Sequence, residues 1–113
     1  MVKYKFVLAA FPFDDFSTLK VRPALCLTNS IGSYKHIVIA FITSKTSQKL
    51  ETTDILIPKS DRSFRKTGLV TDSVIRLHRV ISMPSSLIKR ELRVLPKKFR
   101  TEVDSKLKEL FQL

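Results

Sequence analysis

The sequence alternates short apolar runs with polar turns, a pattern typical of a chain built mainly from β-strands. The runs are rich in β-branched and aromatic side chains and lie at residues 6–11, 22–28, 36–43, 54–57 and 69–83, the last as one strand or two pieces. The run at 36–43 is apolar on both faces. We therefore expect both of its faces to be covered, one by the core and the other by a partner.

Helical spacing appears mainly near the C-terminus. After Pro96, apolar residues recur with a period of 3.6 and predict an amphipathic helix that packs on the core. The apolar stripe consists of Phe99, Val103, Leu107, Leu110 and Phe111. Residues 61–68 predict a turn or a single helical turn closed by Gly68, and residues 84–90 have the composition of a helix start. The fold class is therefore mainly β with short helices.

The length of the chain predicts a single domain spanning residues 1–113. No apolar stretch approaches the ~20 residues needed to cross a bilayer, and the run at 6–11 is too short for a signal peptide. One cysteine, Cys26, cannot form an internal disulfide and favours a reducing compartment. We therefore expect a cytoplasmic protein that has no membrane partner.

The charge of the chain narrows the class of partner. Its 21 Lys and Arg against 10 Asp and Glu give a formal net charge of +11 and a pI near 10.2. Such a field attracts polyanions. On charge alone, the candidate partners are nucleic acid, an anionic membrane surface and an acidic protein.

A single arginine stands where a polar loop meets an apolar strand. Arg22 and Pro23 lead directly into the apolar run. The loop before them, at 12–21, carries polar residues compatible with turns, namely Asp14, Asp15, Ser17, Thr18 and Lys20. In this position a strand holds a cation at the rim of the core, where it is open to an anion. A simple strand-edge charge is the alternative interpretation, and this stretch alone leaves both open.

Several kinds of chemistry find no support in the sequence. Two distant histidines and one cysteine in an apolar run form no recognisable metal-ligand cluster. Asp14 and Asp15 are adjacent in a turn, Gly32 and Gly68 stand alone outside any phosphate-binding loop, and no serine has a nucleophile-elbow context. We therefore expect no metal and no cofactor.

The remaining polar residues suit cleavage of RNA. They are Arg22, Thr43, Ser44, Lys45, Arg76, His78 and Arg79. In RNA the 2′-OH can attack its own phosphodiester through a phosphorane with excess negative charge. Fixed arginines stabilise that charge, and an imidazole can move the proton near neutral pH.

Simpler interpretations exist for individual members of this set. Arg76 and His78 lie on one face of a strand because side chains alternate, yet a structural role for His78 stays open. His36 begins an apolar strand and is interpreted as structural. Thr43 as an ordinary strand residue and Lys45 as a solvated loop charge are the corresponding alternatives.

Five blocks of the sequence resemble the PemK/MazF family, the toxins of type II toxin–antitoxin systems. The blocks are Val-Leu-Ala-Ala-Phe-Pro-Phe-Asp at 7–14, Lys-Val-Arg-Pro-Ala-Leu-Cys-Leu at 20–27, Ile-Thr-Ser-Lys at 42–45, Thr-Gly-Leu at 67–69 and Asp-Ser-Val-Ile-Arg at 72–76. Each block is unspecific by itself. Their occurrence in the family's order in one small basic chain is specific.

The resemblance implies a fold, an activity and partners. The fold is a small SH3-like β-barrel with a C-terminal helix, assembled as a homodimer. The activity is sequence-specific, metal-independent cleavage of single-stranded RNA, without a cofactor. A small acidic antitoxin protein neutralises it by filling the RNA groove.

The resemblance also points to individual residues, because Arg22, Thr43, Ser44, Lys45 and Arg76 match positions in the family's blocks. We predict Arg22, Thr43, Arg76 and His78 as the catalytic residues. Our predicted RNA contacts are Lys20, Ser44, Lys45, Lys49 and Arg79. His78 departs from the family, because some members have an aspartate there. We therefore assign proton transfer to the imidazole as a hypothesis.

A second departure is Lys89-Arg90-Glu91-Leu92, where relatives often have a glycine before the leucine. Two other functions stay open. One is a toxin directed at a protein target, gyrase, on the same scaffold. The other is an RNA-binding relative with weak catalysis.

Overall fold

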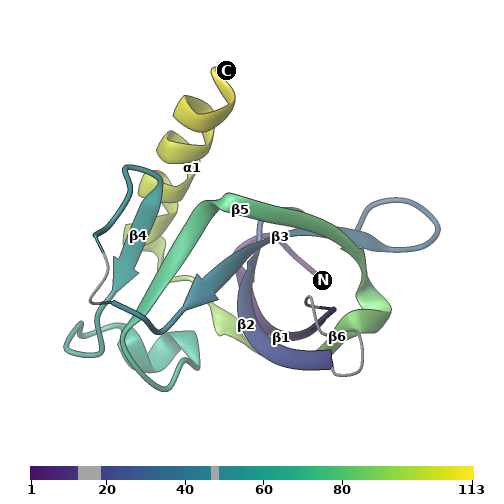
Figure 1. Cartoon of the computed structure of the whole chain (residues 1–113), viewed down its shortest axis with the longest axis horizontal. Helices are drawn as coiled ribbons and strands as arrows, with labels where there is room; N and C mark the ends of the chain where they lie inside the picture. The colour runs from purple at the N-terminus through teal and green to yellow at the C-terminus, as the bar shows by residue number, and fades with distance from the viewer. Residues whose placement is uncertain (13–18, 47–48) are drawn as a thin grey trace.

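The computed structural model describes residues 1–12, 19–46 and 49–113, and these form one antiparallel sheet and a C-terminal helix (Figure 1). The strands are β1 (Lys5–Pro12), β2 (Leu19–Cys26), β3 (His36–Thr43), β4 (Asp54–Ile57), β5 (Ser73–Pro84) and β6 (Ile88–Val94). Two short 3₁₀ helices, η1 (Phe64–Thr67) and η2 (Ser85–Leu87), flank β5, and α1 (Lys97–Phe111) ends the chain. The mainly β class predicted from the pattern is confirmed.

The sheet is strongly curved but is not a closed barrel. Its strand order is β4-β5-β3-β2-β1-β6, so β4 and β6 are the two edges and do not pair with each other. In Figure 1, strands β5, β3, β2, β1 and β6 curl around a common centre, while α1 stands to one side. Register shifts between β3 and β5 and between β1 and β6 mark irregularities that help to bend the strands. The expected barrel is thus a curled open sheet of the same class.

Two apolar clusters cover the two faces of this sheet. One contains Phe6, Ile75 and Leu95 and packs against α1. The other lies on the opposite face and includes Ile37 and Ile39 of β3. The chain itself therefore covers both faces of β3, without the partner that the sequence pattern suggested.

Cys26 belongs to the second cluster and is fully buried. Burial raises the pKa of its thiol to about 11. A thiol that stays protonated at neutral pH is a poor nucleophile.

The sequence misassigned the segment that follows β5. Residues 84–90 were expected to begin a helix, yet only η2 forms there, and β6 follows at once. Charged side chains fill most of β6, and only Ile88 and Leu92 are partly covered. Charged residues are common on edge strands because they discourage pairing with other chains. They also interrupt the alternation of apolar and polar residues by which a strand is recognised in a sequence.

Smaller differences occur at the ends of two other strands. β5 begins at Ser73 and not at residue 69, and β2 begins at Leu19, inside the expected loop, and ends at Cys26. The helical turn expected at 61–68 is η1, and Gly68 closes it with a φ of 78°. A Cβ on Gly68 would lie 3.1 Å from the Cβ of Leu92. Glycine therefore serves both the backbone conformation and the close approach to β6.

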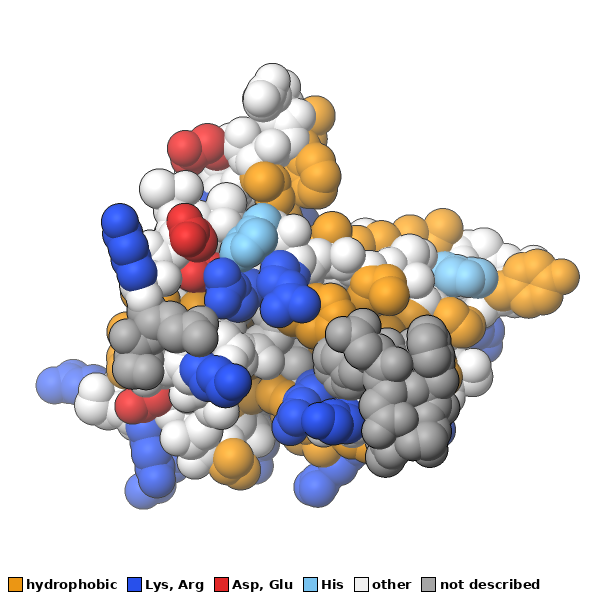
Figure 2. Space-filling model, viewed as in Figure 1, with side chains coloured by type: hydrophobic (Ala, Val, Ile, Leu, Met, Phe, Trp, Pro, Cys, Tyr) orange, Lys and Arg blue, Asp and Glu red, His pale blue; other side chains and the backbone are white. Residues whose placement is uncertain are grey.

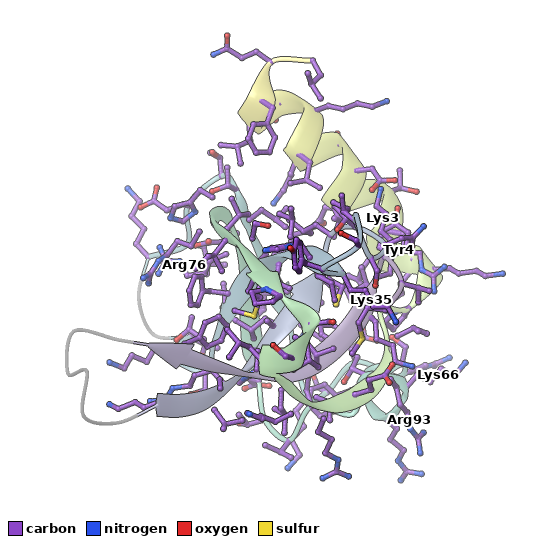
Figure 3. All side chains as sticks on the ribbon, turned by 90° about the vertical axis from the view of Figure 1, so that its right-hand side faces the viewer. Lys3, Tyr4, Lys35, Lys66, Arg76 and Arg93 are labelled. Carbon is purple, nitrogen blue, oxygen red and sulfur yellow. The ribbon has the colours of Figure 1, made fainter. Side chains whose placement is uncertain are left out.

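Helix α1 packs on the first cluster through Phe99, Val103 and Leu107. Val103 is fully buried, and the hydroxyl of Tyr4, which lies beside α1 (Figure 3), donates to the carboxylate of Asp104 at 2.7 Å. The far end of the predicted stripe leaves the core, since Phe111 is 56% exposed. In the described part of the chain, no helix is long and apolar enough to cross a membrane.

An ion pair ties α1 to the turn before η1. The carboxylate of Asp61 binds Lys98 of α1 and accepts hydrogen bonds from the backbone N–H and the hydroxyl of Ser63. These hydrogen bonds lower the pKa of Asp61 to about 2, and the one from Lys98 has the largest effect. Because the folded pKa lies below the unfolded value of about 3.9, the carboxylate stabilises the fold above pH 4, and this contribution is lost as the pH falls towards 2.

We therefore expect Asp61→Asn to lower the free energy of unfolding near neutral pH, and this difference from wild type to shrink between pH 4 and pH 2. Urea unfolding of both proteins at several pH values measures it. A difference that stays constant down to pH 2 would show that the charge of Asp61 does not stabilise the fold.

Candidate active site

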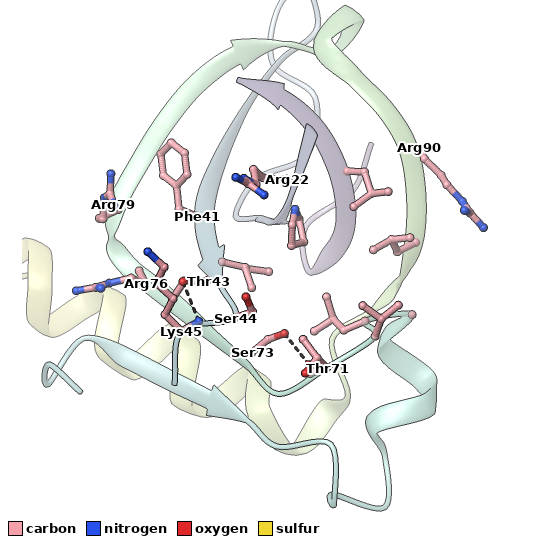
Figure 4. Close-up of a pocket in the computed structure, with 17 residues that line it drawn as sticks. Arg22, Phe41, Thr43, Ser44, Lys45, Thr71, Ser73, Arg76, Arg79 and Arg90 are labelled. Atoms are coloured by element: carbon pink, nitrogen blue, oxygen red, sulfur yellow. Dashed lines mark hydrogen bonds between the residues drawn. The ribbon is translucent and has the colours of Figure 1, made fainter. Parts of the chain in front are cut away.

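A pocket of about 820 Å³ opens on the curved sheet, between β2, β3, β5, β6 and the segment after Gly68 (Figure 4). Its apolar lining includes Leu8, Phe41 and Leu92. Its polar lining is cationic and rich in hydroxyl groups. The cations are Arg22, Lys45, Arg76, Arg79 and Arg90, and the hydroxyls belong to Thr43, Ser44, Thr71 and Ser73.

No carboxylate is found in the described lining of this pocket. Because the described lining carries five cations and no acid, the field inside this concave site is positive. The space-filling view shows blue Lys and Arg side chains gathered around the hollowed centre of this face (Figure 2). The pocket thus fits an anion with several charges.

Arg22 is held at the rim of the core, as its sequence context predicted. It lies on β2 opposite Ala9 of β1 and is exposed, while Ala24 two residues later is fully buried. Pairing of β2 with β3 starts at Ala24, the residue after Pro23, so that Arg22 is not paired with β3. In Figure 4, Arg22 lies near the centre of the pocket and Arg90 points away from it.

The hydroxyl-rich wall begins where β3 ends. Thr43 is the last residue of β3, and its Oγ1 accepts the backbone N–H of Lys45 at 3.1 Å. This bond fixes the turn that presents Ser44 and Lys45 to the pocket. Thr43 pairs with Val74 of β5, and next to it the hydroxyl of Ser73 donates to the carbonyl of Thr71 at 2.9 Å. Hydroxyls from β3, from β5 and from the segment before β5 therefore meet at this end of the β3–β5 ladder.

Arg76 and Arg79 form the wall on β5. A register shift lies in this part of the β3–β5 ladder, where Ala40 pairs with Val80 and Phe41 pairs with Arg76. The guanidinium of Arg79 lies 5.1 Å from the ring centroid of Phe41, a cation–π contact. The irregular ladder thus brings two arginines only three positions apart to one pocket.

His78 lies beside this wall but outside the described lining of the pocket. Its Nδ1 is 2.9 Å from the hydroxyl oxygen of Thr53 and 3.9 Å from Oδ1 of Asp54. The same Oδ1 is 3.5 Å from Nε of Arg76. Arg76 and His78 therefore do share one side of β5, as predicted, and both approach Asp54.

The structure brings six of the nine predicted site residues into one pocket. These are Arg22, Thr43, Ser44, Lys45, Arg76 and Arg79. Lys20 and Lys49 are exposed outside the pocket, and His78 lies at its side. The roles of all nine stay predictions.

Two residues near the site were missed by the sequence analysis. Arg90 belongs to β6, which was not recognised as a strand. Asp54 was visible only as the start of the short strand β4, and no local pattern shows that it pairs with Arg76. Among the residues described by the structure, no group of three or more His, Cys, Asp or Glu side chains is arranged to hold a metal ion.

A curved antiparallel sheet, a C-terminal helix and a cationic pocket define a small basic protein of the mainly β class. Sequence comparison makes the class specific. Residues 3–111 match the family described as the PemK-like, MazF-like toxin of type II toxin–antitoxin systems. The chain belongs to this family, which confirms the resemblance seen in the five sequence blocks.

Solved structures of similar proteins support the fold. The Mycobacterium tuberculosis toxin MazF-mt6 is 18% identical, with a TM-score of 0.73 over 96% of this chain and 97% of that chain. MazF from Deinococcus radiodurans is 19% identical, with a TM-score of 0.71 over 100% and 97%. An endoribonuclease from Mycobacterial species in complex with its cognate antitoxin is 10% identical, with a TM-score of 0.74 over 100% and 96%. Comparison with curated proteins gives no significant match.

Proposed function

We propose that this toxin-family protein is a sequence-specific endoribonuclease that cleaves single-stranded RNA without a metal ion. The observation that carries the proposal is the pocket lined by five cations and four hydroxyls, with no carboxylate among its described lining residues. A phosphodiester backbone needs such a positive track. The name of a structural neighbour, an endoribonuclease, adds support.

The proposed reaction uses the 2′-OH of the RNA as nucleophile. Its oxygen forms a bond to phosphorus, the bond from phosphorus to the 5′-oxygen breaks, and the proton lost from the 2′-OH is balanced by one gained at the 5′-oxygen. The products are a 2′,3′-cyclic phosphate and a 5′-OH. In this proposal, Arg22 and Arg76 stabilise the phosphorane charge, Thr43 positions the phosphate, and His78 moves the proton.

The remaining cations would bind the RNA backbone on either side of the cleaved bond. Ser44, Lys45 and Arg79 lie in the pocket, next to the proposed catalytic residues. Lys20 and Lys49 are exposed outside it and would extend the positive track. Contacts of this kind add affinity for all RNA sequences and make binding dependent on salt.

We also propose that a small acidic antitoxin neutralises the protein, which acts on mRNA in the cytoplasm as a homodimer. The net charge of +11 favours an acidic partner. Structural neighbours include an endoribonuclease with its cognate antitoxin and MazE-MazF from Deinococcus radiodurans. An acidic segment seated in the cationic pocket would exclude RNA from it.

Purified, antitoxin-free protein mixed with a long single-stranded RNA and EDTA tests the proposal. We expect discrete cuts whose fragments carry 2′,3′-cyclic phosphate and 5′-OH ends. Single-stranded DNA of the same sequence is the matched control, and it should stay intact because it lacks the 2′-OH. Mapping of the fragment ends gives the recognition motif.

Other outcomes point to different functions. Cleavage that EDTA abolishes would overturn the metal-free mechanism. Intact RNA that folded protein retains in a salt-dependent manner would indicate an RNA-binding relative without catalysis. Intact RNA without retention would favour a toxin directed at a protein such as gyrase.

A further inference from the structure

A buried carboxylate lies directly behind the cationic wall of the pocket. Asp54 is the first residue of β4, is 4% exposed, and pairs with Arg76 in the β4–β5 ladder. It does not line the pocket. A burial this deep is unusual for aspartate unless its charge is compensated.

The backbone of Asp54 and one of its carboxylate oxygens are held by neighbouring segments. Oδ2 accepts the backbone N–H of Glu51 at 2.8 Å, and the backbone N–H of Asp54 donates to the carbonyl of Glu51 at 3.0 Å. The carbonyl of Asp54 accepts a hydrogen bond from Nζ of Lys106 in α1 at 2.7 Å. These bonds fix where the second oxygen, Oδ1, lies.

Oδ1 of Asp54 faces a second buried atom that also lacks a hydrogen-bond partner. Within the described chain, Oδ1 of Asp54 and Nε of Arg76 are the buried side-chain atoms without a hydrogen bond, and they lie 3.5 Å apart. A small side-chain movement would turn this ion pair into a direct N–H···O bond. Two opposite charges in a site of low polarity attract strongly at this distance.

Contact at Nε leaves the two terminal amino groups of Arg76 unused. They make no hydrogen bond or ion pair with the described residues, and the side chain lines the pocket. An arginine offers its donors as a planar fork. A carboxylate that contacts Nε therefore fixes the orientation of the guanidinium plane, and with it the direction in which the two terminal amino groups meet a phosphate.

We propose that Asp54 is a positioning residue that holds Arg76 ready for the phosphate of the RNA. The proposal rests on the ribonuclease function proposed above. A preset guanidinium needs no reorientation as negative charge develops, so it stabilises the transition state more effectively. Burial behind Arg76 keeps the negative charge of Asp54 away from the RNA backbone.

The test compares Asp54→Asn with a matched variant, Asp61→Asn. Both changes remove the charge of a carboxylate paired with a basic side chain, but Asp61 pairs with Lys98 and does not line the pocket. We expect Asp54→Asn to lower kcat for RNA cleavage by about 10- to 100-fold. KM, and binding of a 2′-O-methyl RNA that cannot be cleaved, should change by less than about threefold, and Asp61→Asn should keep the wild-type kcat.

A double-mutant cycle identifies the group through which Asp54 acts. In the Arg76→Ala background, Asp54→Asn should have little further effect on kcat. A full effect in that background, together with no effect in a His78→Gln background, would overturn the proposal, because Asp54 would then act through the imidazole. An unchanged kcat in the single Asp54→Asn variant would overturn it as well.

A spectroscopic measurement separates this proposal from the ribonuclease function. The NMR signal of the Arg76 Nε–H group, identified by its loss in Arg76→Lys, should shift in Asp54→Asn and stay in place in Asp61→Asn. If the wild-type protein does not cleave RNA, the proposed function fails, yet this signal still reports whether Asp54 holds Arg76. A signal unaffected by Asp54→Asn would refute the positioning role.

Discussion

Replacement of Arg22 by alanine is expected to lower kcat for RNA cleavage by about 10²- to 10³-fold, the usual cost of losing a donor to a developing oxyanion. Arg22 stands near the centre of the pocket (Figure 4), on a strand that is buried from Ala24 onward. Its guanidinium is therefore fixed by the sheet and open to the phosphate. Single-turnover kinetics on a short RNA that contains the mapped cleavage motif measure the loss.

Lys20 provides the matched control for Arg22. It lies two positions earlier on β2, so its side chain shares the same side of the strand, but it is outside the pocket. Lys20→Ala should weaken binding to all RNA sequences and lower the slope of log K against log salt by about one, with kcat unchanged. Equal losses of kcat in both variants would show that Arg22 contributes only general charge.

Replacement of Phe6 by alanine is expected to lower the free energy of unfolding by about 3–5 kcal/mol, because it leaves a cavity in the first cluster. Phe6 is fully buried on β1, within the cluster that also packs against α1. A loss of this size is a large share of the stability of a small domain, about 5–15 kcal/mol. Urea unfolding followed by circular dichroism measures it.

Phe111 is the matched control for this second substitution. The change Phe111→Ala removes the same kind of side chain, but from the last turn of α1, where Phe111 is 56% exposed. We expect Phe111→Ala to change the free energy of unfolding by less than about 1 kcal/mol. Similar losses for both variants would mean that the end of α1 is packed in solution against something outside this chain.

The position of Asp54 gives a physical interpretation of the departure at His78. The family resemblance implies an aspartate at this position in some members, two residues after the arginine. Here the carboxylate that approaches Arg76 comes from the neighbouring strand β4. A carboxylate on the neighbouring strand can therefore supply the negative charge beside Arg76 when residue 78 of β5 is a histidine.

Local pattern predicted some elements well and failed at one. The expected strands at 36–43 and 54–57 coincide with β3 and β4, because apolar β-branched runs between turn residues have few alternative structures. β6 was missed because charged residues at an edge strand remove the apolar alternation. For the same reason Arg90, which β6 contributes to the pocket lining, could not be foreseen.

The sequence by itself determined the positive charge of the protein, most of its strands, its C-terminal helix and its family. The tertiary structure decided which of the many cations share a pocket, that the sheet curls without closing, and that Asp54 faces Arg76 while His78 lies outside the lining. The physical reason is that antiparallel pairing joins residues distant in the chain. Its register depends on packing and on the irregular β3–β5 ladder, which no local run of residues specifies.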